Sequence, residues 1–265
     1  MAGGTSFYFS HAIKHMPVQY HLVTALAKED HHFVDDLIQA GIDTTVLSSK
    51  HTVYFENIYP DQSDYREQKV LSIADPFLAA DMMDLQASVF HLGPLLANDM
   101  SVELIRSLST KGKISLDVQG FLRKVINQEV MATDWVNKKE VLPYIHILKA
   151  NETEAEKLTG LSNHYDAAKS LADDGIQEVI ITLGSKGSLI YAEGNFYEVP
   201  AIQPTAVVDA TGCGDTYMAG YLYKRFQKAN YYDAGLFGAA MASIKIAASG
   251  PFNGTEKAII DVLKL

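Results

Sequence analysis

Residues 207–220 combine the residue types and the spacing that phosphoryl chemistry requires. Val207 and Val208 indicate the end of a buried strand, a glycine-rich turn follows, and apolar residues at helical spacing from Met218 to Phe226 predict a helix. The first amides of a helix have no partner within it, and the helix dipole adds partial positive charge at the same place. This strand, turn and helix start therefore predict a site for an anion, phosphate above all.

Asp215 lies in the first turn of this predicted helix and has two interpretations. Gly212 and Gly214, just before it, allow a ligand to approach the backbone closely. A carboxylate in the first turn is an ordinary stabilising choice, which would make Asp215 a cap. Alternatively, a carboxylate beside a phosphate cradle is placed to take a proton from a hydroxyl that attacks a phosphoryl group. Local features leave both interpretations open.

The whole run from Asp209 to Asp215 resembles the Asp-Thr-x-Gly-Ala-Gly-Asp signature of the ribokinase/PfkB carbohydrate-kinase family. The resemblance implies that the amides of Gly212, Cys213 and Gly214 form an anion hole and that Asp215 is the catalytic base. Ala210 stands where Thr is usual and Cys213 where Ala is usual. Both replacements are small, so the roles of the backbone are unaffected. Asp209 matches a family residue that can ligate a monovalent cation, which implies activation by K⁺.

A second motif follows a predicted buried strand over residues 145–148. Asn151 is a favourable helix cap and Glu154 stands three residues on, which is the spacing of a capping box. The same two residues resemble the family's Asn-x-x-Glu motif, which orders Mg²⁺ and its waters near the phosphates. Mg²⁺ keeps water ligands and needs few carboxylates, so Glu154 acting through waters is chemically reasonable. Taken locally, the two interpretations are equally supported.

The resemblance also implies a site for ATP. Thr182, Gly184 and Gly187 end a predicted strand over residues 178–182 and most simply form a turn. They resemble the family's nucleotide loop, where such residues line the phosphates and ribose of ATP. Ala239, in a small-residue helix predicted over residues 234–248, takes a position beside the adenine that is often Asn in the family. That replacement implies the loss of one polar contact to adenine.

The acceptor side of the resemblance depends on Gly3, Gly4 and Gln119. Family members have a Gly-Gly pair that opens a helix and contacts sugar hydroxyls through the backbone. Gln119 follows a predicted strand over residues 114–118, at the carboxyl end where open α/β sheets bind ligands, although an ordinary loop role is equally compatible. In the family a strand and an acidic residue precede the Gly-Gly pair. This chain is therefore expected either to lack them or to be translated from further upstream.

The elements that position these residues alternate between strand and helix. Further strands are predicted over residues 20–25, 44–47 and 88–92, and helices over residues 32–40 and 100–108, with Thr5 or Ser6 as the cap of a first helix. Such alternation predicts right-handed crossovers and a mostly parallel sheet. Together with the resemblance, it predicts an α/β, ribokinase-like three-layer fold: a mostly parallel central sheet flanked by helices, in one domain spanning residues 1–265.

Residues 51–73 interrupt this alternation. Apolar side chains fall on both faces of residues 51–59, a polar turn is expected at residues 60–64, and the chain returns over residues 66–73, which predicts a hairpin. The local interpretation is an edge hairpin, whereas the resemblance implies a β-lid that covers the sugar and often pairs with another subunit. Because a two-stranded ribbon is marginal alone, we expect a small lid and a homodimer through it.

Composition limits the class of protein. Of 265 residues, 48% are hydrophobic and 20% charged, the balance of a soluble globular protein, and no apolar run approaches the ~18 residues of a membrane span. A net charge of −10 without a Lys/Arg cluster argues against nucleic-acid binding. The single cysteine, Cys213, fits a cytoplasmic location. Its thiol lies near a helix N-terminus and could be reactive, but a small residue tolerated in a tight turn is the simpler interpretation.

The predicted function is ATP-dependent phosphorylation of a hydroxyl on a small sugar or polyol. Residues 52–76 and 117–123 most resemble the inositol-kinase branch of the family. Two alternatives are a nucleoside kinase of the same fold and a nucleotide-binding protein without kinase activity. Product formation across a panel of acceptors distinguishes all three.

Overall fold

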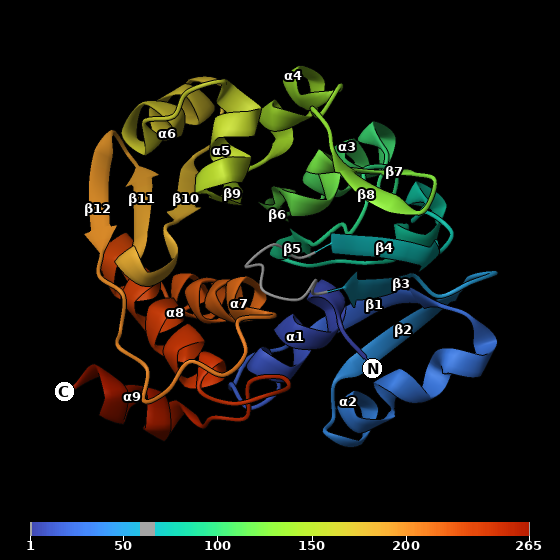
Figure 1. Cartoon of the computed structure of the whole chain (residues 1–265), viewed down its shortest axis with the longest axis horizontal. Helices are drawn as coiled ribbons and strands as arrows, with labels where there is room; N and C mark the ends of the chain where they lie inside the picture. Colours follow the sequence, from blue (N-terminus) through green and yellow to red (C-terminus); the bar gives the residue numbers. More distant parts are fainter. Residues whose placement is uncertain (1, 59–66, 265) are drawn as a thin grey trace.

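The computed structural model describes residues 2–58 and 67–264 and contains three β-sheets (Figure 1). The largest has six strands in the order β12-β11-β10-β9-β6-β5. Its strands are β5 (Val89–Leu92), β6 (Lys113–Asp117), β9 (Ile147–Asn151), β10 (Glu178–Thr182), β11 (Ser188–Ala192) and β12 (Asn195–Val199). Strands β5, β6, β9 and β10 are parallel, and β11 and β12 continue the sheet antiparallel. The predicted mostly parallel sheet is confirmed.

Helices cover both faces of this sheet. Because successive side chains of a strand point to opposite faces, Leu148 joins one hydrophobic core and its neighbour Ile147 joins another. The first core lies under α3 (Val102–Ser109), α5 (Glu152–Thr159) and α6 (His164–Asp173), and α4 (Lys138–Val141) adds to it. The second lies under α1 (Gly4–Ile13), α7 (Cys213–Phe226), α8 (Tyr231–Ile246) and α9 (Glu256–Leu263). The result is the predicted three-layer α/β architecture.

The lid is larger than the predicted hairpin. Strands β3 (Tyr54–Ile58) and β4 (Glu67–Ser72) pair antiparallel as expected, but β8 (Glu129–Ala132) and β7 (Arg123–Ile126) extend them to a sheet of four, in the order β3-β4-β8-β7. The predicted turn at residues 60–64 lies outside the described residues. Strands β7 and β8 are joined by Asn127 and Gln128, both at positive φ, as a type I′ hairpin turn requires. Asn-Gln is a weak turn signal, and the sequence therefore did not predict this hairpin.

Two strands stand apart from the large sheet. Strand β1 (His21–Leu26) pairs in parallel with β2 (Asp43–Ser48), and α2 (Asp35–Gln39) links them. A cavity of about 1110 Å³ is lined by β1 on one side and β5 on the other. His91 of β5 lines it, and its Nε2 has no hydrogen-bond partner within the described residues. The cavity thus separates the large sheet from the β1–β2 pair, and no strand of the described residues joins the two.

Two local predictions differ from the structure. The first helix begins at Gly4 with Gly3 as its N-cap, so Thr5 and Ser6 are not its caps. The extended conformation of Gly3 and the positive φ of Gly4 (+78°) explain why glycines open this helix. Residues 28–39, predicted as a helix over 32–40, form a 3₁₀ helix (Lys28–Val34) followed by α2. Further 3₁₀ turns are Ala79–Met82, Val118–Leu122, Leu142–Tyr144 and Gly184–Lys186.

Glycines bring α7 and α8 into close contact. A Cβ on Gly238 of α8 would lie 2.6 Å from the carbonyl oxygen of Tyr217, a backbone atom that cannot move independently of α7. Gly220 of α7 faces Gly238 in the same contact. The small-residue character predicted for residues 234–248 therefore serves helix packing, whatever else it does.

We predict that Gly238→Ala lowers the free energy of unfolding by about 1–3 kcal/mol, because the added methyl overpacks this contact. Urea denaturation monitored by circular dichroism measures the change. Gly3→Ala is the matched control, because a Cβ there meets only the Tyr8 ring at 4.0 Å and the backbone is extended. Equal stability of the two variants would contradict the prediction.

Candidate active site

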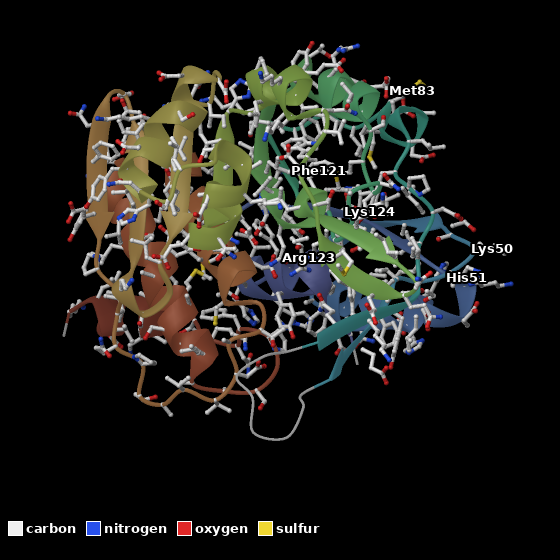
Figure 2. All side chains as sticks on the ribbon, turned by 45° about the horizontal axis from the view of Figure 1, so that its top comes forward. Lys50, His51, Met83, Phe121, Arg123 and Lys124 are labelled. Carbon is white, nitrogen blue, oxygen red and sulfur yellow. The ribbon has the colours of Figure 1, made fainter. Side chains whose placement is uncertain are left out.

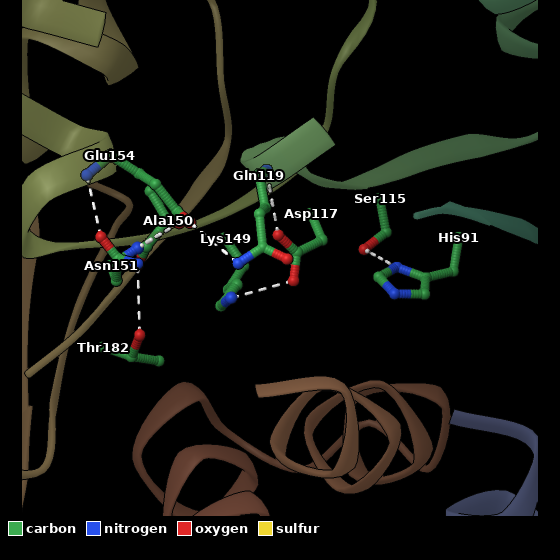
Figure 3. A network of polar contacts seen from close by, with 9 residues as sticks. All are labelled: His91, Ser115, Asp117, Gln119, Lys149, Ala150, Asn151, Glu154 and Thr182. Carbon is green, nitrogen blue, oxygen red and sulfur yellow. Dashed lines mark hydrogen bonds and ion pairs between the residues drawn. The ribbon is translucent and has the colours of Figure 1, made fainter. Parts of the chain in front are cut away.

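The carboxyl ends of the four parallel strands meet at one edge of the large sheet. Asp117 ends β6 and lies opposite Lys149 of β9, while Asn151 ends β9 and lies opposite Thr182, the last residue of β10. Figure 3 shows these residues together, with Thr182 below Asn151 and Asp117 next to Lys149. Parallel strands deliver polar residues from distant parts of the chain to one edge, and this edge contains Gln119, Asn151, Glu154 and Thr182 of the predicted site.

The glycine-rich loop that opens α7 faces this edge. Gly212 is the N-cap of α7 at φ +77°, and a Cβ there would lie 2.2 Å from the Tyr8 ring of α1, so only glycine fits. The Cys213 amide donates to the Ala210 carbonyl at 3.2 Å. For the amides of Gly214 and Asp215, no partner occurs within the described residues. The N–H groups available to an anion thus lie at Gly214 and Asp215.

The carboxyl group of Asp215 contacts a different helix from its own. Its side chain accepts a hydrogen bond from Thr5, in the first turn of α1, and Gly212 rather than Asp215 is the N-cap of α7. Part of the residue remains accessible, although protein atoms closely surround the carboxyl group. This geometry does not match the cap interpretation, in which the carboxylate would serve its own helix.

The surroundings of Asp215 change its acidity. Burial, together with the charge of Asp117, raises the pKa of Asp215 to about 7, even though Lys149, the bond from Thr5 and Arg123 act to lower it. Arg123 lies at the start of β7, where the chain passes from the large sheet to the lid (Figure 2). A carboxyl group with a pKa near neutrality accepts and returns a proton readily at physiological pH. Asp215 is therefore suited to general base catalysis.

Lys149 is a site residue that sequence reasoning missed. Its ammonium group is buried and lies 2.9 Å from a carboxylate oxygen of Asp117 (Figure 3). A Cβ on Gly214 would lie 3.0 Å from Lys149 Nζ, so the ammonium group lies directly against the loop. Asp117, Glu154 and Asp215 raise the pKa of Lys149, against the opposing effect of burial. A charged side chain on an otherwise apolar strand was the available signal.

Asn151 and Glu154 form the capping box that their spacing predicts. Each side chain bonds the other residue's amide at 2.8 Å. The second carboxylate oxygen of Glu154 accepts a hydrogen bond from Gln119 Nε2 at 3.4 Å. Burial raises the pKa of Glu154, Lys149 lowers it, and the net effect is a rise. The capping box uses one carboxylate oxygen of Glu154. The other oxygen faces Gln119 and the ion pair of Lys149 with Asp117.

The predicted nucleotide residues are only partly brought together. Thr182 neighbours Asn151 and its hydroxyl donates to the Ala150 carbonyl at 3.4 Å (Figure 3). Gly184 and Gly187 both have positive φ, and a Cβ on Gly187 would collide with the Val199 carbonyl. The glycines are thus required by the turn itself. Ala239 is buried in the core beneath α7 and α8.

The predicted acceptor residues lie on the other side of Asp215. Gly4 packs against Leu95, and the Thr5 side chain packs against Gly93, just beyond the end of β5. Gly3 and Gly4 therefore lie next to the hydroxyl that bonds Asp215. Gln119 lies between this region and Glu154.

Asp209 contacts a lysine. Its Oδ1 accepts from the Thr211 amide at 2.9 Å, and its Oδ2 lies 3.1 Å from the Nζ of Lys245. Burial acts to raise the pKa of Asp209, but these bonds outweigh it and lower the pKa. Burial raises the pKa of the Cys213 thiol to about 11, which disfavours a reactive thiolate and agrees with the simpler interpretation of a small residue in a tight turn. No cluster of three His, Cys, Asp or Glu side chains suited to a metal occurs in residues 2–58 and 67–264.

Comparison with known proteins identifies the family. Residues 2–258 match the family described as pfkB family carbohydrate kinase. The chain belongs to this family. Among curated relatives, it is 29% identical over 175 residues to a cytidine kinase of Thermococcus kodakarensis, which covers 64% of this chain and 60% of that protein. It is 28% identical over 189 residues to a ribokinase of Arabidopsis thaliana, covering 64% and 50%. These matches thus span only half to three fifths of the relatives' length.

Solved structures match this pfkB-family chain over nearly all its length. A pyrophosphate-dependent kinase in the ribokinase family, in complex with a pyrophosphate analog and myo-inositol, has a TM-score of 0.87 at 28% identity, covering 99% of this chain and 92% of that one. Arabidopsis thaliana ribokinase with ribose and ATP has a TM-score of 0.80 at 20% identity, which supports the fold alone. The ribokinase-like fold is confirmed. No helix in the described ranges is long and apolar enough to cross a membrane.

We predict that kcat/KM falls about tenfold per pH unit below pH 7, because a general base must be deprotonated and the pKa of Asp215 is raised to about 7. Initial rates between pH 5.5 and 9 measure this profile. Circular dichroism over the same range is the control for unfolding. A profile that stays flat down to pH 5.5 would remove the assignment of Asp215 as base.

Proposed function

We propose that this protein transfers a phosphoryl group to a hydroxyl of a small sugar or polyol. The observation that carries the proposal is Asp215: a carboxyl group with a pKa raised to about 7, next to unpartnered helix-start amides and a buried ammonium. Family membership supports the same reaction class.

Each residue has a role that follows from its position. Asp215 accepts the proton of the attacking hydroxyl, which the Gly3–Gly4 end of α1 orients next to Thr5. The amides of Gly214 and Asp215 and the Lys149 ammonium stabilise negative charge on the transferring group, as preorganised donors do without reorganisation. Cys213 and Gly212 shape this loop. Gln119 is placed to contact the acceptor or Glu154.

Glu154 and Asn151 would hold Mg²⁺ through water. The fit is chemical: one oxygen of the buried Glu154 carboxylate lies outside the capping box, and Mg²⁺ takes few protein carboxylates. When bound, Mg²⁺ supplies charge neutralisation for the phosphates. Thr182, Gly184, Gly187 and Ala239 would contact a nucleotide donor at the β10 side.

Two donors are candidates. ATP follows from the motifs that contain Thr182, Gly184 and Gly187. Inorganic pyrophosphate is favoured by a specific observation: three matched structures at 27–28% identity are pyrophosphate-dependent kinases, with TM-scores of 0.87–0.88 and 91–92% of their chains covered. One of these structures is in complex with myo-inositol, and another is of a myo-inositol kinase. Both support a polyol acceptor here. The relatives named cytidine kinase and nucleoside kinase support the nucleoside alternative.

We predict product formation with one donor–acceptor pair in a panel of ATP and pyrophosphate against sugars, polyols and nucleosides. Asp215→Asn should lower kcat about 10²–10⁴-fold with donor binding retained, because it removes the base and keeps the shape. Mass spectrometry of the phosphorylated acceptor and titration calorimetry of the donor measure both quantities. Donor binding without turnover across the panel would favour a non-catalytic binding protein. Near-normal turnover of the variant would remove the base.

We also propose that the lid forms a homodimer. Apolar side chains lie about half exposed on three of the lid strands or next to them, whereas Val70 on β4 is buried, so strand alternation and the pairing register assign them to the outer face. They are Leu71, Ile73, Ile126 and Met131. An apolar sheet face of this kind is typical of a protein interface.

The cytoplasmic location inferred from the single cysteine stays a prediction.

We predict that Leu71→Asp shifts the protein from dimer to monomer, because a charge in the centre of the lid face opposes burial. Size-exclusion chromatography with light scattering measures the mass. Val136→Asp is the control, because Val136 is 89% exposed and lies outside the lid strands. A wild-type monomer, or a variant that remains dimeric, would contradict the proposal.

A further inference from the structure

A buried ammonium lies where the family resemblance implies a monovalent cation. Lys245 is in the last turn of α8, and its side chain has no exposed surface. Its Nζ donates to the backbone carbonyl of Asp209 at 2.6 Å and lies 3.1 Å from Oδ2 of the same residue. A carbonyl and a carboxylate oxygen, both from Asp209, thus hold one positive charge.

An aromatic ring also lies near this ammonium. The Tyr8 ring of α1 lies 5.9 Å from Nζ, within the range of a cation–π contact. Burying a lysine is costly unless an opposite charge and hydrogen-bond acceptors compensate it. Asp209 supplies both, so the pair is electrostatically matched inside the protein.

The pair fixes the loop that leads to the phosphoryl site. The amides of Val208 and Asp209 donate to the Ile246 carbonyl at 2.8 and 3.2 Å, immediately after Lys245. On its other side, Asp209 accepts from Thr211. The backbone is thereby held from both directions just before Gly212 opens α7. Within the described part of the chain, the polar contacts of Lys245 are with Asp209 rather than with Asp215 or the amides of Gly214 and Asp215, so it is a positioning residue.

The charge of Lys245 also reaches the loop. Asp209 contributes to raising the pKa of both Tyr8 and Cys213, and Lys245 opposes it at Cys213. Without a neighbouring cation, Asp209 would place a negative charge next to a site for phosphate. A cation at this position therefore has two roles. It holds the shape of the loop, and it balances the negative charge of Asp209.

K⁺ does not fit these residues as they stand. The two Asp209 oxygens that would ligate it already contact Lys245, and a second positive charge would lie next to the first. We infer that Lys245 is a built-in replacement for the monovalent cation, and that this protein positions its phosphoryl loop without K⁺. A test of this inference by turnover rests on the proposed function, whereas a test by thermal melting does not.

The experiment compares cations at equal ionic strength, in chlorides of K⁺, Na⁺, NH₄⁺ or tetramethylammonium. Wild-type turnover should change by less than about twofold among them, whereas Lys245→Met should lose activity in tetramethylammonium and regain at least about fivefold in K⁺ or NH₄⁺, the lower end of typical coupling between sites. Lys224→Met, at a partly exposed lysine paired with Glu256, is the matched control and should not respond.

Thermal melting provides a readout that needs no turnover. K⁺ and NH₄⁺ should raise the Tm of Lys245→Met and leave that of the wild type unchanged, since only the variant has a vacant position. If Lys245→Met does not fold, Lys245→Gln, whose amide retains a donor for the Asp209 carbonyl, takes its place. Stimulation of wild-type turnover by K⁺ above about fivefold, a wild-type Tm that rises with K⁺, or a folded variant insensitive to cations would each overturn the inference.

Discussion

A buried ion pair between Lys149 and Asp117 holds the centre of the candidate site together. Both side chains are more than nine-tenths buried and come from neighbouring parallel strands. Losing one partner of such a pair costs about 3–5 kcal/mol, because the other charge stays buried and uncompensated. The pair therefore fixes where β6 and β9 end relative to each other. It also places a positive charge against Gly214, where the proposed function requires a charge that attracts phosphate.

The position of α1 completes this arrangement from the other side. The Tyr8 ring occupies the space beside Gly212 where a Cβ would lie, and Thr5 bonds Asp215. The first residues of the chain are thereby brought against residues 212–215, which follow them by some two hundred positions. A helix that begins with two glycines can approach both a strand end and another helix closely. The same closeness lets burial act on the Asp215 carboxyl group and raise its pKa.

Two lysines thus serve the loop in different ways. Lys149 lies against Gly214, on the side proposed for the transferring group, whereas Lys245 bonds Asp209. Both are paired with an aspartate, which makes their burial tolerable. The proposed anion site is consequently built from helix-start amides supported by two fixed charges. In an acidic protein of net charge −10, such local charges decide where an anion can bind.

The local motifs were readable from the sequence because they depend on short spacings. The capping box at Asn151 and Glu154, the helix start at Gly212 and the parallel strands follow from neighbours along the chain, and so does the α/β class. The Gly3–Gly4 helix opening was implied by the family resemblance alone. The strand end predicted at Val207 and Val208 was wrong, because both side chains are exposed and no strand forms there. Lys149, Lys245 and the second lid hairpin were not predicted, because a lysine in an apolar strand or helix looks ordinary until its partner is known. Those partners, Asp117 and Asp209, lie more than thirty residues away. Spacing and residue type determined which groups could bind phosphate, and only the tertiary structure decided which buried charges surround them, because electrostatic energy depends on distance in space rather than along the chain.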